Sequence, residues 1–140
     1  MLTETTGDIW SYVETHRIII PTNQLGVMGA GLALAAKKRY PGLQTAYQQA
    51  FRSGYDKRLP WCSNSYTDLI LAPTKRHWRD KSRIEDVANL LIELSKIEGG
   101  PFACPELGCG LGGLKWMDTA PLYKVLELIP QDWTIVHPNR

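Results

Sequence analysis

The chain has 140 residues, of which 44% are apolar and 21% are charged, and its formal net charge is +2. These values are typical of one globular domain, here over residues 1–140, and exclude a disordered or low-complexity chain. The small net charge gives no compositional reason to expect a nucleic-acid-binding protein.

Strand-like and helix-like segments alternate along the chain. Apolar, β-rich runs predict strands over 17–22, 69–74, 101–105 and 133–137, and weaker patterns predict short strands before residue 7 and over 61–65. Helical patterns cover 31–39 and 43–52, and a last one runs from 118 or 119 to 128. This alternation predicts an α/β layered fold with a largely parallel or mixed sheet.

The clearest helical pattern begins at Ser82, where Ser82 and Glu85 match an S-x-x-E capping box. The apolar residues that recur at helical spacing after it are Ile84, Val87, Ala88, Leu91 and Leu94, and the pattern ends at 99–100. In sheets of this class, ligands bind at the carboxyl ends of the strands. The loops that follow residues 22, 74 and 105 are therefore the candidate site.

The chain has three cysteines, Cys62, Cys104 and Cys109, which cannot all pair with one another and lack the spacing of a zinc site. The first ten residues contain neither the basic nor the apolar segment of a secretory signal, and no apolar run is long enough to span a membrane. We therefore expect a cytoplasmic protein with reduced thiols, no bound metal and no membrane contact.

Two glycine-rich loops are the strongest functional signal. Residues 105–116 read PELGCGLGGLKW and residues 26–31 read GVMGAG. Glycine lets backbone amides turn toward an anion, and the amino end of a helix adds a favourable dipole. A flexible connection explains one such loop, but two in one small domain indicate two walls of one site.

The later loop does not fit a dinucleotide fingerprint. Gly108, Gly110 and Gly113 satisfy G-x-G-x-x-G, but only one helix and one strand follow, and the nearest acid, Glu127, lies within that helix. The lysine and hydroxyl residue of a P-loop are also absent. The loops therefore predict diphosphate binding by backbone amides, with a nucleotide or nucleotide sugar as the ligand.

Single polar residues near these loops each have two interpretations. Asn23 could hold a ribose hydroxyl or only its own turn, and Asp8 could accept from a base amine or only cap a turn. His137 could line the pocket or only end the last strand. Lys75 directly follows a strand and has cations around it, which favours a neutral and nucleophilic amine.

Residues 75–83, KRHWRDKSR, hold five cations directly before the predicted third helix. Cations at a helix amino end oppose the dipole by about 0.3–1 kcal/mol each, which indicates an anionic partner more than a solvated loop. Trp78 could stack on a base or pack beneath the loop. The nucleic-acid contacts that the segment predicts are Arg76, His77, Trp78 and Arg79.

Together these motifs resemble a macrodomain, the ADP-ribose-binding fold. The resemblance covers nearly the whole chain, through Gly7-Asp8-Ile9, NQLGVMGAGLALAAKKRYP, LAPTKRHWRDKSR and PELGCGLGGLKW. It is strongest to the branch of DarG antitoxins and terminal ADP-ribose protein glycohydrolases, which remove single ADP-ribose groups from thymidine in DNA or from acidic side chains. The resemblance implies a three-layer α/β/α fold with a mixed, mostly parallel central sheet.

The resemblance also implies roles for individual residues, with Lys75 attacking C1″ of the distal ribose, Asp8 holding the adenine amine and Asn23 contacting the distal ribose. The full set of implied ADP-ribose contacts is Asp8, Ile9, Asn23, Met28, Gly29, Ala30, Gly31, Thr74, Gly108, Cys109, Gly110, Leu111, Gly112, Gly113 and His137. The protein glycohydrolases have an aspartate where this chain has Gly112, which favours a DarG-type mechanism with lysine as the main catalytic residue.

The function implied by the resemblance is a mono-ADP-ribosyl hydrolase that acts on ADP-ribosylated DNA, without a cofactor and as a monomer. Its expected partners are ADP-ribose or an ADP-ribosylated substrate, and single-stranded DNA. Two alternatives stay open, namely dephosphorylation of ADP-ribose 1″-phosphate and non-catalytic binding of ADP-ribose.

Overall fold

The computed structural model describes residues 1–63 and 68–139. These residues contain one six-stranded sheet in the order β1-β6-β5-β2-β4-β3. The strands are β1 (Leu2–Thr6), β2 (Arg17–Asn23), β3 (Trp61–Cys62), β4 (Leu69–Lys75), β5 (Phe102–Cys104) and β6 (Trp133–His137). Neighbouring strands pair in parallel, except that β3 runs antiparallel to β4. The prediction of a mixed, mostly parallel sheet is confirmed.

The strand predictions are correct in place and nearly correct in extent. The prediction for 133–137 matches β6, and β2 and β4 each continue one residue further, through Asn23 and Lys75. β5 excludes Pro101 and Pro105, since proline has no N–H to donate to a neighbouring strand. Residues 64 and 65 of the predicted strand at 61–65 lie outside the described residues.

The helices are η1 (Ile9–Tyr12), α1 (Gly31–Arg39), α2 (Leu43–Arg52), α3 (Ile84–Ser95), α4 (Trp116–Thr119) and η2 (Ala120–Leu128), of which η1 and η2 are 3-10 helices. Both α1 and α2 have the predicted bounds, and the three cations in the last turn of α1 complement its dipole. The predicted start of the last helix is too late, because α4 begins at Trp116, whose ring packs against Tyr123 at 5.0 Å between centroids.

The start of α3 also differs from the prediction. The helix begins at Ile84, its N-cap is Arg83, and no side chain caps it. Instead, the Ser82 N–H donates to the Gly112 carbonyl at 2.9 Å, and Ser82 Oγ is buried without a hydrogen-bond partner among the described residues. The capping-box prediction is wrong because a loop distant in sequence takes Ser82 away from the helix. The helix also ends earlier than predicted, at Ser95.

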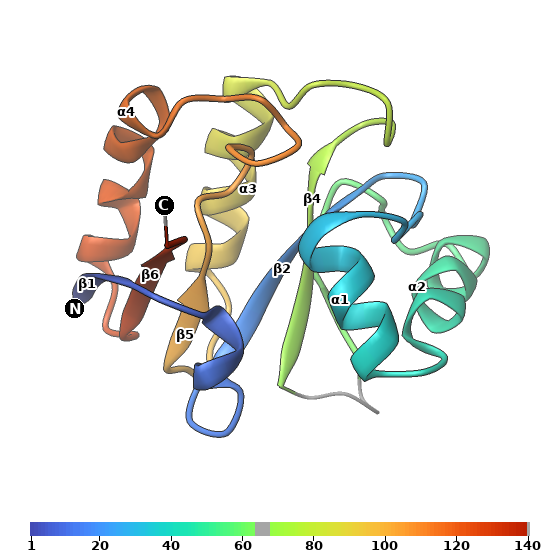
Figure 1. The fold of residues 1–140 in the computed structure, drawn as a ribbon, viewed down its shortest axis with the longest axis horizontal. Coiled ribbons are helices and arrows are strands. Elements are labelled where there is room, and N and C mark those ends of the chain that lie inside the picture. The colour runs from blue at the N-terminus through green and yellow to red at the C-terminus, as the bar shows by residue number, and fades with distance from the viewer. Residues whose placement is uncertain (64–67, 140) are drawn as a thin grey trace.

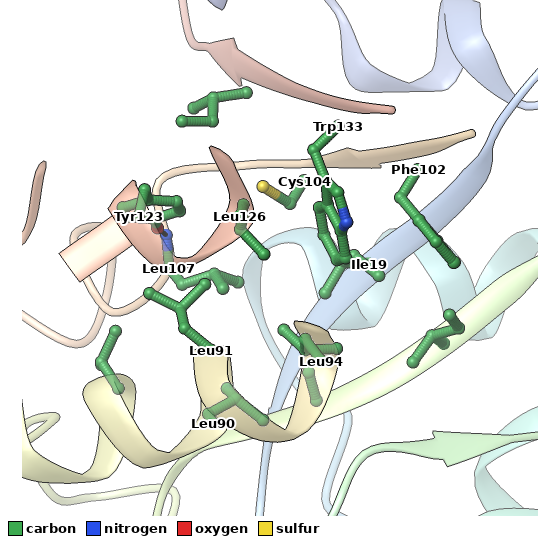
Figure 2. Close-up of a cluster of buried hydrophobic side chains, with 14 residues drawn as sticks. Ile19, Leu90, Leu91, Leu94, Phe102, Cys104, Leu107, Tyr123, Leu126 and Trp133 are labelled. Atoms are coloured by element: carbon green, nitrogen blue, oxygen red, sulfur yellow. Dashed lines mark hydrogen bonds between the residues drawn. The ribbon is translucent and has the colours of Figure 1, made fainter. Parts of the chain in front are cut away.

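Alternate residues of β2 supply the two cores of the domain. Ile18 and Ile20 belong to the core under α1 and α2, whereas Ile19 belongs to the core under α3 and η2, as the two-residue period of a strand requires. Figure 1 shows the two helix pairs on opposite sides of the sheet. Figure 2 shows the second core, in which the rings of Phe102 and Trp133 stack at 4.6 Å between centroids. The three-layer α/β/α architecture is therefore confirmed.

The fold brings the predicted site residues to one edge of the sheet. Because β2, β4, β5 and β6 run parallel, their carboxyl ends share an edge, and the loops that follow β2, β4 and β5 gather at the top of Figure 1. Asn23, Lys75 and His137 are the last residues of β2, β4 and β6. Among the helices of the described residues, none has the length and apolar character needed to cross a membrane.

Candidate functional site

The side chain of Asn23 holds the chain that leads into the first glycine loop, residues 26–31. Asn23 is 6% exposed, and its Oδ1 accepts from the N–H groups of Leu25 and Val27, both at 3.1 Å. Its Nδ2 donates to the Val27 carbonyl at 2.8 Å. The carboxamide therefore shapes its own loop, as the turn interpretation predicts, and keeps one N–H for a further acceptor.

Backbone amides at the amino end of α1 are free of partners within the described chain. The N–H groups of Gly29, Ala30 and Gly31 have no acceptor there, whereas the N–H of buried Met28 donates to Gln44 Oε1 at 2.8 Å. Gly31 has a φ of +56°, which residues with a side chain rarely adopt. Unpaired amides at the start of a nine-residue helix form a favourable environment for an anion.

The second glycine loop, residues 105–116, folds back on itself through backbone hydrogen bonds. The Leu114 N–H donates to the Gly108 carbonyl at 2.9 Å, and the Gly113 N–H donates to the Gly110 carbonyl at 3.1 Å. Gly108 and Gly113 both have a φ of +79°, which this path requires. The N–H groups of residues 110–112 have no acceptor among the described residues, and those of the exposed residues Gly110 and Leu111 are available to an anion.

The two glycine loops touch each other. A Cβ placed on Gly31 would lie 3.4 Å from Cδ1 of Leu111 in the second loop. Leu111 is 66% exposed, so its side chain reaches toward the first loop instead of entering the core. The loops therefore lie side by side and can act as two walls of one site, as the sequence predicts.

Gly112 is buried at a point where no side chain fits. A Cβ there would clash with Ser82 Oγ and with the Gly108 carbonyl oxygen, and it would lie 2.9 Å from the Gly108 carbonyl carbon. Its φ is not positive, so lack of space and not backbone strain requires glycine. An aspartate at this position would not fit the loop in its present path.

We expect Ser82→Ala to leave the free energy of unfolding unchanged or to raise it. Burial of an unpaired hydroxyl costs about 1–3 kcal/mol, and the substitution keeps the backbone bond from residue 82 to Gly112. Denaturant unfolding followed by circular dichroism measures the difference. As a control, Thr22→Val removes a buried hydroxyl that is bonded to Tyr47 Oη at 3.1 Å and should destabilise the fold by about 1 kcal/mol. Equal losses in the two variants would contradict the prediction.

Lys75 ends β4 next to the first glycine loop. The strand register pairs Asn23 with Lys75, and the Lys75 carbonyl accepts from the Gln24 N–H at 2.9 Å. The Lys75 Nζ donates to the Trp78 backbone carbonyl at 3.4 Å, a long hydrogen bond that a ligand can replace. The Lys75 amine therefore links the end of β2 to Trp78 in the basic segment.

The cations of the basic segment, residues 75–83, have different partners. Arg76 forms a two-point ion pair with Asp86 at 3.1 and 3.3 Å, and this pair raises the pKa of Arg76. The Arg79 guanidinium lies 4.6 Å from the ring centroid of Trp78, which is 45% exposed. The His77 ring lies beside the Trp78 ring, with 5.3 Å between the two ring centroids and 31° between the ring planes. The structure therefore favours the exposed alternative for Trp78.

His137 lies between two carboxylates at the end of β6. Its Nδ1 is 2.6 Å from Glu106 Oε2, its Nε2 is 2.8 Å from Glu4 Oε1, and its ring meets Trp116 edge-on at 4.8 Å between centroids. Burial favours the neutral ring, but the hydrogen bonds to Glu106 and Glu4 outweigh this effect and raise the pKa of His137. Both ring nitrogens are therefore occupied within the protein.

Comparison with known proteins identifies the same fold. No family model matches the chain. The macrodomain of Mycobacterium tuberculosis DarG has a TM-score of 0.81 and 30% identity, and the match covers 100% of this chain and 99% of that one. The chain belongs to the macrodomain family.

Other relatives place this macrodomain near the same branch. The macrodomain of Thermus aquaticus DarG matches with a TM-score of 0.82 and 27% identity over 98% of this chain and 97% of that one. The DNA ADP-ribosyl glycohydrolase of Mycobacterium tuberculosis is 32% identical over an alignment 149 positions long, which covers 99% of this chain and 42% of that protein. The chain thus spans less than half the length of the first curated relatives that it matches.

Three further residues predicted to contact the ligand, Asp8, Ile9 and Thr74, have structural roles in the macrodomain. The Asp8 carboxylate accepts from the Trp10 N–H at 3.0 Å and caps η1, while Ile9 is buried at 7% exposure. Thr74 is 3% exposed and donates to the Thr22 carbonyl at 3.5 Å. These bonds fix the rim of the site, and they leave the exposed side of Asp8 open to a ligand.

Sequence reasoning misses Glu4, Glu106 and Trp116 of this macrodomain, which surround His137. Glu4 and His137 lie on neighbouring strands at opposite ends of the chain, so no local spacing connects them. Glu106 does carry a signal, because an acid inside an anion-binding loop would repel the ligand unless a cation balanced it. Within residues 1–63 and 68–139, no cluster of three or more histidine, cysteine or acidic side chains could hold a metal ion.

Proposed function

We propose that this macrodomain is a DNA ADP-ribosyl glycohydrolase, which releases ADP-ribose from a modified base. The observation that carries the proposal is a pair of touching glycine loops with unpaired amides at 29–31 and 110–112, beside Lys75 at a strand end. The relative that bears this name matches 99% of the chain. DarTG of Thermosipho africanus, whose structure was solved with ADP-ribose, matches 96% of it at a TM-score of 0.82 and 29% identity.

The two glycine loops suit the diphosphate of ADP-ribose. Internal hydrogen bonds already hold both loops in shape, so binding an anion there requires little reorganisation. Among the described residues, the exposed backbone N–H groups at 29–31, 110 and 111 have no acceptor, which matches the need of two phosphates for several donors. Asp8 at one end of this edge and Asn23 near Lys75 supply polar groups for the adenine and the distal ribose.

Lys75 supplies the chemistry in this proposal. Its neutral amine attacks C1″ of the distal ribose, the bond from C1″ to the base breaks, and the base leaves with the electron pair and takes up a proton. Water then hydrolyses the adduct between Lys75 and the sugar, which releases ADP-ribose and restores the amine. The loop has no room for a side chain at Gly112, which supports a mechanism in which no carboxylate at position 112 takes part.

The stack of Trp78 and Arg79 is the proposed contact for single-stranded DNA. An exposed indole offers a face to a base, and the guanidinium beside it offers charge to a phosphate. A groove of about 470 Å³ that Arg76 also lines suits a nucleic acid less well, because its charged lining is Asp56, Arg58, Arg76, Asp86 and Glu93. Acids outnumber cations there, so we place the strand on the Trp78 side.

Trp78→Ala should weaken binding of a single-stranded, ADP-ribosylated oligonucleotide by about 1–3 kcal/mol, the usual value of one stacked base. Affinity for free ADP-ribose should not change, since Trp78 lies outside the glycine loops. Fluorescence anisotropy measures the first quantity and calorimetry the second. Trp78→Phe keeps a stacking ring, and Arg58→Ala removes an arginine from the acidic groove, so both controls should bind nearly as wild type. Equal weakening by Arg58→Ala would contradict the proposed path.

A turnover panel tests the proposed function itself. The wild-type protein is incubated with ADP-ribosylated single-stranded DNA, ADP-ribosylated protein and ADP-ribose 1″-phosphate, and released ADP-ribose and phosphate are measured by mass spectrometry. Release of ADP-ribose from the DNA alone is the expected result. Phosphate release from the 1″-phosphate would instead identify a phosphatase, and tight ADP-ribose binding without turnover of any substrate would identify a reader.

We also propose that the protein is a monomer and works in the cytoplasm. Within the described residues, Cys62, Cys104 and Cys109 form no disulfide, which suits a reducing compartment. Size-exclusion chromatography with light scattering tests the monomer, and a dimer mass would contradict it.

A further inference from the structure

Lys81 joins the basic segment to the second glycine loop. The next residue, Ser82, is buried, and its N–H donates to the Gly112 carbonyl at 2.9 Å. A Cβ placed on Gly113 would lie 3.6, 3.8 and 3.9 Å from Cδ, Cγ and Cε of Lys81. The aliphatic stem of this lysine therefore lies along the face of the loop at Gly113. Both segments are at the top of Figure 1, where the chain between β4 and α3 contacts the loop after β5.

The part of the loop next to Lys81 is a tight turn that exposes free amides. The Gly113 N–H donates to the Gly110 carbonyl at 3.1 Å and closes the turn at 110–113. Gly110 and Leu111 are exposed, and their N–H groups have no acceptor among the described residues. Because the Lys81 ammonium is one bond beyond Cε, a positive charge lies beside the turn that offers these donors.

The charge of Lys81 is not neutralised within the described residues. The residue is exposed and forms no ion pair with an acid there, including Asp80 next to it in sequence. Arg76 differs, because Asp86 holds its guanidinium at 3.1 and 3.3 Å. A lysine whose stem packs on a surface while its ammonium stays in water keeps that charge available to a ligand.

Packing alone is the simpler explanation for the contact of Lys81 with Gly113. Any long unbranched side chain could cover the glycine, and many exposed charges contribute little. Charge is the property that separates the two explanations. Backbone amides carry only partial charges, whereas a phosphate carries a formal negative charge, so an ammonium beside the turn adds an attraction that the amides cannot supply.

We propose that Lys81 is a phosphate-binding residue beside the turn at 110–113. Two kinds of phosphate in the substrate suit this position, namely the diphosphate bound at amides 110 and 111 and the backbone of a DNA strand that passes Trp78. The chemistry is the same for both, an ammonium paired with phosphate oxygens. This inference rests on the proposed function, because it takes ADP-ribosylated DNA as the substrate. It extends the predicted contacts of the basic segment beyond Arg79 to the second glycine loop.

Lys81→Met tests the proposal, because it removes the ammonium and keeps an unbranched stem that can cover Gly113. Calorimetry measures the affinity for free ADP-ribose, and fluorescence anisotropy measures the affinity for an ADP-ribosylated single-stranded oligonucleotide. At least one affinity should fall by roughly fivefold, the upper value for one exposed ion pair. A loss with both ligands would assign Lys81 to the diphosphate, and a loss with the oligonucleotide alone would assign it to the DNA backbone.

Two further variants and a salt series separate charge from packing. Lys81→Arg keeps the charge and should retain most of the affinity. Lys38→Met makes the same change in net charge in the last turn of α1, at the far end of that helix from the first glycine loop, and should bind as wild type. The loss in Lys81→Met should shrink as salt rises from about 0.05 M to about 0.5 M, because salt screens an exposed pair.

Unchanged affinity of Lys81→Met for both ligands would overturn the inference, as would an equal loss in Lys38→Met or a loss that Lys81→Arg shares at every salt concentration. No binding of ADP-ribose by the wild type would contradict the proposed function instead. Inorganic pyrophosphate would then test Lys81 alone, since it presents a diphosphate without a nucleoside. The amide chemical shifts of Gly110 and Leu111 should respond to it more weakly in Lys81→Met than in wild type. An equal response, or none in either protein, would overturn the inference.

Discussion

Lys75→Ala should reduce the release of ADP-ribose from DNA by roughly 10³-fold or more, as expected when the nucleophile of a covalent mechanism is removed. Binding of ADP-ribose should persist, because the free amides of the two glycine loops are unchanged. Single-turnover kinetics on an ADP-ribosylated oligonucleotide measures the rate, and calorimetry measures the binding. Wild-type turnover by the alanine variant would contradict the assigned mechanism but not the ligand.

Lys75→Arg separates nucleophilicity from charge. Arginine keeps the positive charge beside Asn23 and Gln24 but cannot lose its proton to become a nucleophile. We expect this variant to be as slow as the alanine variant. Borohydride added during wild-type turnover should also reduce the sugar–lysine imine and leave ADP-ribose attached to the peptide that contains Lys75. Activity in the arginine variant would mean that position 75 contributes only charge.

Gly112→Ala should destabilise the protein by about 3 kcal/mol, the upper range for forcing a methyl group into a packed site. The new Cβ would collide with Ser82 Oγ on one side and the Gly108 carbonyl on the other. Relief requires the loop to leave the start of α3, to which the Gly112 carbonyl is bonded through the Ser82 N–H. Thermal unfolding should show a melting temperature lower by roughly 10 °C, and ADP-ribose affinity should fall with it.

Gly110→Ala is the matched control in the same loop. A Cβ on Gly110 meets nothing within 4 Å, and Gly110 does not have a positive φ. In the absence of ligand, this substitution should change the stability by less than about 0.5 kcal/mol. Similar losses of stability in both variants would show that the loop tolerates no side chain for some reason other than the contacts of Gly112.

The order and type of the elements could be predicted because their signals are local. The apolar runs at 17–22 and 69–74 and the bounds of α1 and α2 follow from composition and from breakers such as Pro41. The start of α3 could not be predicted in this way. The spacing of Ser82 and Glu85 fits a capping box, but the second glycine loop competes for Ser82, and that competition is visible only after the chain has folded.

The candidate site likewise contains residues that the sequence could locate and residues that it could not. Asn23, Lys75 and the two glycine loops could be located because each follows a predicted strand, and parallel strands end at one edge. The surroundings of His137 could not, since Glu4 and Glu106 reach it through the pairing of β6 with β1 and β5. The order of residues along the chain does not reveal which distant strands become neighbours in a parallel sheet.

The free amides of the glycine loops have a practical consequence for genetic screens. An alanine scan removes side chains, yet the donors at 29–31 and 110–112 belong to the main chain and survive every such change. A scan would therefore rank Lys75 and structural residues highest and would overlook most of the diphosphate contacts. Replacing single amides with esters by chemical synthesis deletes the donor itself, and this approach would map the recognition surface that conventional mutagenesis cannot detect.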